Sequence, residues 1–109
     1  MGLTRILDPI FILSGASPLS ITKTLIGDIL VLNAKGSLSG TTSPQTISLL
    51  VGATTVDTVA IRLSGGSAVS PFALEAKFTV AVAGTQSITV STTGGTIGQL
   101  VIMATVYRH

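Results

Sequence analysis

The sequence predicts a single all-β domain, an antiparallel β-sandwich or barrel of about seven or eight strands without a substantial helix. Three observations lead to this prediction. Thr, Val, Ile, Ser and Gly dominate the 109 residues, and Glu occurs once. Branching at Cβ favours strands. Apolar and polar residues alternate in runs, and Gly, Ser or Pro separates these runs at intervals of about 8–12 residues.

The N-terminal segment, residues 1–26, is expected to form an arm or edge strands that precede a sandwich of residues 27–109. The apolar stretch at 10–13 is too short for a signal peptide and follows an interrupting Asp8-Pro9 pair. We therefore predict a short strand at 10–13 and a second one at 19–25.

Three further strands are predicted in the first half of the sandwich, each bounded by Gly or Pro. They cover residues 28–35, 45–51 and 55–63. Asp28 is expected at the start of the first of these strands. The loops between them, 36–44 and 64–71, are rich in Gly, Ser and Thr, as exposed turns usually are.

The clearest strand covers residues 72–82, because its side chains alternate with a period of two. Its apolar face consists of Phe72, Leu74, Ala76, Phe78, Val80 and Val82. Ala83-Gly84-Thr85 predicts a tight turn in which Gly84 adopts a positive φ. Residues 86–92 are predicted to return as the partner of this strand, and residues 97–107 form the last strand.

The chain contains more apolar surface than one small core can bury. It is 46% hydrophobic but only 9% charged, whereas about a quarter of an ordinary soluble domain is charged. Its longest apolar runs, 29–32 and 100–104, are far shorter than the roughly 18–20 residues that span a bilayer.

Two predicted strands are apolar on both faces, at residues 29–34 and 100–107. A strand of a sandwich ordinarily has one solvent-exposed, polar face. Because both faces of these strands are apolar, either another subunit or a folded-back loop must cover the face that does not meet the core. We favour a subunit interface, because large apolar patches are rare on monomers, and expect a homo-oligomer, with a trimer favoured. The candidate interface residues are Ile29, Val31, Val101, Met103 and Tyr107.

The sequence predicts no catalytic, cofactor-binding or metal-binding residues, and we expect a protein that is not an enzyme. His109, the only histidine, has no evident group to orient it. Asp28, Asp57 and Glu75 lie on separate predicted strands, and no Asp-x-Asp cluster or His pair suggests a metal. The cations are scattered instead of forming a basic stripe. We therefore expect no nucleic acid, membrane or small-molecule substrate as a partner.

Residues 72–92 carry a resemblance to a known family. They combine an alternating strand, an Ala-Gly-Thr turn and the strand segment Ile88-Thr89-Val90. A Gly-rich loop, Thr93-Gly94-Gly95, and a closing strand at 100–107 follow. Over roughly residues 27–107 this order is similar to the small jelly-roll proteins of tailed bacteriophage virions, and tumour-necrosis-factor-like modules share it. The resemblance implies an antiparallel β-sandwich of the jelly-roll type.

The resemblance also implies a function. Such virion proteins are typically capsid cement or decoration proteins, often trimeric, that stabilise the phage head by binding between major capsid proteins. The chain would then be made in the host cytoplasm and reside on the capsid surface. The N-terminal arm would contact the shell through Ile10, Phe11, Ile12 and Leu13. The alternative is a tail or fibre tip, or a lectin-like module, that recognises host sugar through loops 36–44 and 64–71.

Overall fold

The computed structural model describes residues 9–40, 44–63 and 69–108, and these residues form eight β-strands. The strands are β1 (Pro9–Gly15), β2 (Leu19–Thr24), β3 (Ile29–Ser39), β4 (Gln45–Val51), β5 (Thr54–Ile61), β6 (Val69–Thr79), β7 (Gly84–Thr92) and β8 (Thr96–Tyr107). Within the described ranges no helix is long and apolar enough to cross a membrane.

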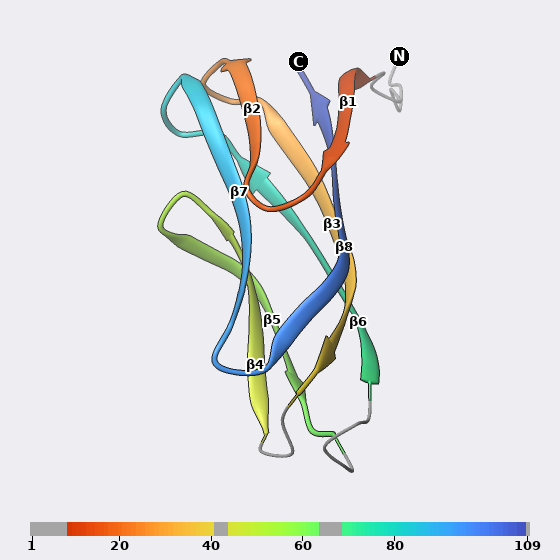
Figure 1. Cartoon of the computed structure of the whole chain (residues 1–109). Coiled ribbons are helices and arrows are strands. Elements are labelled where there is room, and N and C mark those ends of the chain that lie inside the picture. Colours follow the sequence, from red (N-terminus) through yellow and green to blue (C-terminus); the bar gives the residue numbers. More distant parts are fainter. Residues whose placement is uncertain (1–8, 41–43, 64–68, 109) are drawn as a thin grey trace, which may run out of the picture.

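The strands form two four-stranded antiparallel sheets that pack face to face (Figure 1). Sheet A has the order β1-β8-β3-β6, and sheet B has the order β2-β7-β4-β5. The predicted all-β sandwich is therefore confirmed. Gly84 has φ 120°, as the turn prediction required.

The pairing of the strands is nested along the chain. β4 pairs with β5, β3 with β6, β2 with β7 and β1 with β8, and the pairs β3–β8 and β4–β7 join these into two sheets. The predicted partnership between strands 72–82 and 86–92 is wrong, since β6 and β7 lie in different sheets. The Val80 N–H donates to the carbonyl of Asp28 at 2.8 Å, so the chain stays beside β3 until it crosses to sheet B.

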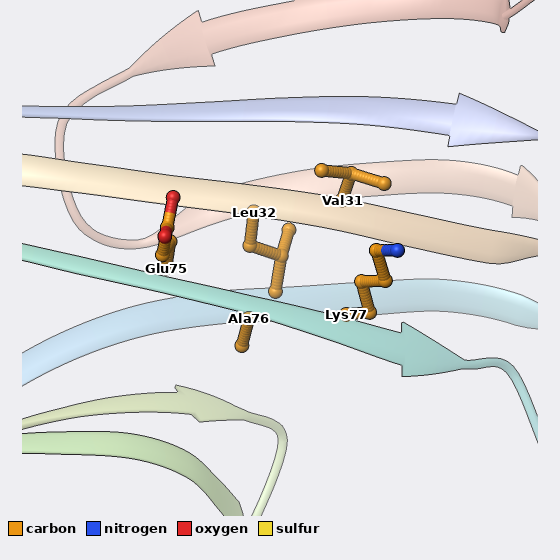
Figure 2. Close-up of a pocket in the computed structure, with 5 residues that line it drawn as sticks. All are labelled: Val31, Leu32, Glu75, Ala76 and Lys77. Atoms are coloured by element: carbon orange, nitrogen blue, oxygen red, sulfur yellow. The ribbon is translucent and has the colours of Figure 1, made fainter.

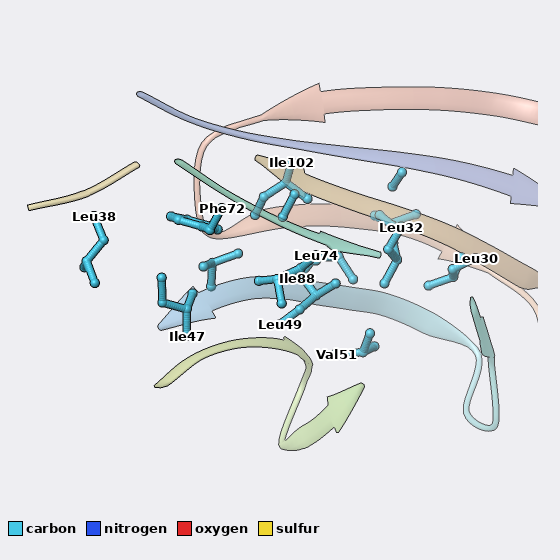
Figure 3. Packing of buried hydrophobic residues seen from close by; sticks show 14 of the residues in the cluster. Leu30, Leu32, Leu38, Ile47, Leu49, Val51, Phe72, Leu74, Ile88 and Ile102 are labelled. Atoms are coloured by element: carbon cyan, nitrogen blue, oxygen red, sulfur yellow. The ribbon is translucent and has the colours of Figure 1, made fainter. Parts of the chain in front are cut away.

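The core lies between the two sheets, where alternate side chains of each strand meet (Figure 3). β3 and β8 supply the centre of sheet A's inner face with fully buried residues: Leu30, Leu32, Ala34, Ile102, Ala104 and Val106. Across from them sheet B contributes Ile47, Leu49, Val51, Ile88 and Val90. The predicted alternation of β6 holds from Phe72 to Val80. It fails at Val82, which is 73% exposed because the strand has already ended at Thr79.

The N-terminal segment is part of the sandwich wherever the structure describes it. Residues 10–13, predicted as a short strand of the N-terminal arm or sheet edge, lie in β1, which pairs with β8 in a register that sets Leu13 opposite Ala104. β2 likewise forms the edge of sheet B beside β7. Of the two forms expected for residues 1–26, an arm or edge strands, the structure has edge strands at β1 and β2, because backbone pairing joins both segments to the sheets. Residues 1–8 lie outside the described residues.

A buried carboxylate closes the end of the sandwich at which β3 begins. The Asp28 side chain is 1% exposed and accepts hydrogen bonds from Arg108 Nε at 2.9 Å, Arg108 Nη2 at 2.8 Å and the Leu25 N–H at 2.9 Å. Such a bidentate pair combines charge with fixed geometry. It fastens the end of β8 to the β2–β3 turn, and the hydrogen bond to Asp28 is the main reason why the pKa of Arg108 is raised.

Replacing Asp28→Asn should lower the free energy of unfolding by about 1–3 kcal/mol, because an amide cannot accept hydrogen bonds at both terminal atoms and leaves buried donors unpaired. The matched change Glu75→Gln, at an exposed position of β6, should cost less than about 0.5 kcal/mol. Chemical denaturation of both variants measures the difference, and equal losses would contradict the role given to Asp28.

The loss of unfolding free energy caused by Asp28→Asn should stay constant from about pH 7 to about pH 10. The folded-state pKa of Arg108 is raised above its ordinary value, so the ion pair contributes fully below the unfolded-state pKa and is lost only as the pH rises through the folded-state pKa. Denaturation curves of the parent chain and the Asp28→Asn variant across this range test the point.

Candidate interaction face

The outer face of sheet A carries side chains that point away from the core. On β3 and β8 the residues between the buried ones face outward, and the half-buried Ile29, Val31 and Tyr107 are among them. Val101 is 49% and Met103 is 47% exposed. Both faces of these two central strands are therefore apolar, as the sequence predicted.

Strand register brings these outward side chains together. Ile29 lies opposite Tyr107, and Asn33 lies opposite Met103. On the other side of β8, Ile12 of β1 lies opposite Thr105 and is 58% exposed. We name this row of side chains across β1, β8 and β3 the apolar strip: Ile12, Ile29, Val31, Val101, Met103 and Tyr107.

All five residues predicted as an interface lie on the apolar strip. Ile12, which the sequence assigned to an arm, lies on the same strip through the pairing of β1 with β8. Its neighbour Leu13 points the other way and packs against the core. Alternation along β1 was the available signal, but a short run at the start of a chain does not reveal which strand it will join.

Charged side chains border the apolar strip along β6. A shallow depression of about 310 Å³ is lined by Val31, Leu32, Glu75, Ala76 and Lys77. In Figure 2 Val31, Glu75 and Lys77 rise from the outer side of the sheet, whereas Ala76 points to the opposite side. A second depression of about 240 Å³ is lined by Asn33, Lys35, Val101 and Met103. The face therefore combines an apolar strip with a charged margin, an arrangement suited to binding a macromolecular surface.

The three carboxylates that the sequence singled out have different surroundings in the structure. Asp28 is bonded to Arg108. The Asp57 carboxylate accepts hydrogen bonds from the Thr58 N–H at 2.9 Å and from the Glu75 N–H at 3.0 Å. It therefore links β5 of sheet B to β6 of sheet A. Over the residues that the structure describes, no group of three or more His, Cys, Asp or Glu side chains could hold a metal ion. His109 lies outside these residues.

The loops proposed for sugar recognition are shorter than the sequence suggested. Residues 36–39 belong to β3 and residues 69–71 belong to β6, while 41–43 and 64–68 lie outside the described residues. The neighbouring β7–β8 turn is fastened to sheet B, because Thr93 Oγ1 donates to Gln45 Oε1 at 2.6 Å and the Thr93 N–H donates to the Thr46 carbonyl at 3.1 Å. No carbohydrate-binding geometry follows from these contacts.

Comparison with known proteins supports the fold alone. No protein family matches the sequence, and no curated protein matches it. Among solved structures, the chain is similar to dimeric latent PorU from Porphyromonas gingivalis, with a TM-score of 0.53 and 7% identity. The match covers 91% of this chain but 10% of PorU. The likeness therefore concerns a small part of a much longer protein.

Single cysteines can test the assignment of the two faces, because the chain contains no cysteine of its own. At high dilution, Val101→Cys should react with a thiol reagent about a hundredfold or more faster than Val106→Cys, which is buried on the same strand and becomes accessible only by local opening. If the apolar strip is a contact between chains, raising the protein concentration should slow the thiol reaction of Val101→Cys but not that of Val106→Cys. Equal rates for the two cysteines at high dilution would contradict the assignment.

Proposed function

We propose that this chain is a structural virion protein of the jelly-roll type, a cement or decoration protein that assembles as a homotrimer and binds between the major capsid proteins of a phage head. The strand order supports the jelly-roll part of the proposal. Eight strands divide into sheets of order β1-β8-β3-β6 and β2-β7-β4-β5, and double-sheet jelly rolls of eight strands are common in viral capsid and lectin domains.

The observation that carries the proposal is the apolar strip. Its six side chains lie on three neighbouring strands of one sheet, and Ile12, Val101 and Met103 are each about half exposed. In the part of the chain that the structure describes, no helix is present to cover this face. Apolar surface of this kind favours association, because its removal from water stabilises the complex in proportion to the area buried.

The charged margin gives such a contact an orientation. Glu75 and Lys77 are exposed on β6 beside Val31, and Lys35 is exposed beside Val101. Charges at the rim of an apolar contact add little affinity, but they disfavour registers that place like charges together. On a shell, many equivalent contacts of modest strength would add through multivalency.

Native mass provides the first test. Val101→Lys and Met103→Lys should shift the protein from trimer towards folded monomer on a sizing column with light scattering, since each buries an unpaired charge and weakens the contact by about 30-fold or more. Thr46→Lys, at an exposed position on sheet B, should leave the native mass unchanged. A parent chain that is monomeric, or Lys variants that assemble normally, would exclude the apolar strip as the contact between chains.

Shell stability tests the cement role separately. Phage heads that carry the protein should rupture at a higher temperature or a stronger osmotic shock than heads without it, because additional contacts between capsid proteins must be broken. Adding back the purified protein should restore the resistance, whereas the Val101→Lys variant should not. Heads of equal stability with and without the protein would refute the cement function even if the chain is a trimer.

A further inference from the structure

The turns at one end of the sandwich are apolar. In the β2–β3 turn Leu25 is 50% and Ile26 is 72% exposed, and in the β6–β7 turn Val82 is 73% exposed between the exposed Ala81 and Ala83. Exposed turns are ordinarily made of Gly, Asn, Asp, Ser or Pro. Turn geometry therefore does not explain these side chains. We call the group of five residues, Leu25, Ile26, Ala81, Val82 and Ala83, the apolar tip.

The two turns form one surface. The Gly27 N–H donates to the Val80 carbonyl at 2.9 Å, and Thr24 Oγ1 donates to the Gly84 carbonyl at 2.7 Å. Gln86 Nε2 donates to the Val82 carbonyl at 2.7 Å. Figure 1 shows the turns side by side at the end where the N and C labels stand. These hydrogen bonds hold the apolar side chains in place, so that binding through them would need little further ordering.

Cations predominate around the apolar tip. Lys23 lies two residues before Leu25 and Lys77 lies four residues before Ala81, whereas Arg108 is bonded to the buried carboxylate of Asp28. Lys23 directly precedes Thr24 and Leu25 and is exposed. It adopts φ 61° where the pairing of β2 with β7 shifts register, and such bulges often re-aim a side chain. Among the described residues, the exposed Lys23 and Lys77 therefore give the flanks of the apolar tip a positive charge.

We propose that the apolar tip docks on the surface of an anionic phospholipid bilayer. Exposed apolar side chains flanked by cations suit the boundary between headgroups and acyl chains, where the apolar groups enter and the ammonium groups meet the lipid phosphates. The five residues of the tip are too few for an ordinary protein interface, which uses about 20–30 residues on each side. A bilayer needs no matching socket, so it fits a small projecting surface better.

The β7–β8 turn at the opposite end of the sandwich has a different composition. There the β7–β8 turn consists of Thr93, Gly94 and Gly95, and its polar groups bond to Gln45 and Thr46. Neither apolar nor cationic side chains dominate that turn. A bilayer partner differs from the sequence-based expectation of no membrane. That expectation rested on the length of apolar runs, which detects membrane-spanning segments but cannot detect two short turns that meet only in the folded chain.

Flotation with vesicles tests the proposal on the full chain. The parent protein should float with phosphatidylcholine vesicles that contain phosphatidylserine and much less with phosphatidylcholine alone. Val82→Ser should weaken binding to the anionic vesicles about tenfold. The matched change Val69→Ser, at a position 62% exposed near the other end of β6, should leave binding unchanged.

Reversing the charge of Lys23 provides a second test of the proposal. Lys23→Glu should weaken binding to the anionic vesicles about tenfold, since each charge at such a surface contributes appreciably, whereas the exposed Arg62→Glu control should not. Absence of binding by the parent protein, equal binding to both kinds of vesicle, or equal losses within a matched pair would overturn the proposal. If Val82→Ser changes the native mass instead, the apolar tip is a contact between copies of the chain.

The inference stands apart from the proposed function, because it needs neither a trimer nor a shell. The two can fail separately. Val101→Lys alters the apolar strip and is read out by native mass, whereas Val82→Ser alters the apolar tip and is read out by vesicle binding at unchanged native mass. Circular dichroism of each variant confirms that the comparison is made between folded chains.

Discussion

The structure depends on the burial of one set of alternating side chains between two sheets. The chain has no cysteine, and its described residues form no helix, so neither disulfides nor helix packing shares this task. β3 and β8 are each paired on both sides, and Leu30, Leu32, Ile102 and Val106 are fully buried between the sheets. Because neighbouring side chains of a strand point to opposite faces, burying these residues fixes the outward position of the apolar strip.

The two ends of the sandwich are closed by different chemistry. At one end the Asp28–Arg108 pair joins the end of β8 to the β2–β3 turn, and the same turn presents Leu25 and Ile26 to solvent. At the other end neutral hydrogen bonds between Thr93 and Gln45 hold the β7–β8 turn on β4. The ion pair thus does more than close the fold, since it also fixes the turn that carries part of the apolar tip.

Local periodicity predicted faces well and neighbours poorly. The alternation from Phe72 to Val80 correctly separated buried from exposed side chains, and two-sided apolarity at 29–34 and 100–107 identified the residues of the candidate face. The predicted pairing of the strands at 72–82 and 86–92 failed, because a tight turn with a glycine at positive φ serves equally well for a hairpin and for a crossing between sheets. Ile12 lies on the candidate face only because β1 pairs with β8, which places Ile12 opposite Thr105. These two strands lie far apart in the sequence, so no local pattern predicts their pairing.

The sequence by itself determined the all-β class, the positions of most strands and the buried side of β6 from Phe72 to Val80. These properties follow from residue types at short spacing, where β-branched side chains favour extended backbone and a period of two divides the faces. Only the tertiary structure decided which strands are neighbours, how Asp28 meets Arg108, and that two distant turns combine into the apolar tip. Those outcomes depend on contacts between residues far apart in the chain, such as Asp28 with Arg108 and Pro9 with Tyr107, and no local pattern encodes them.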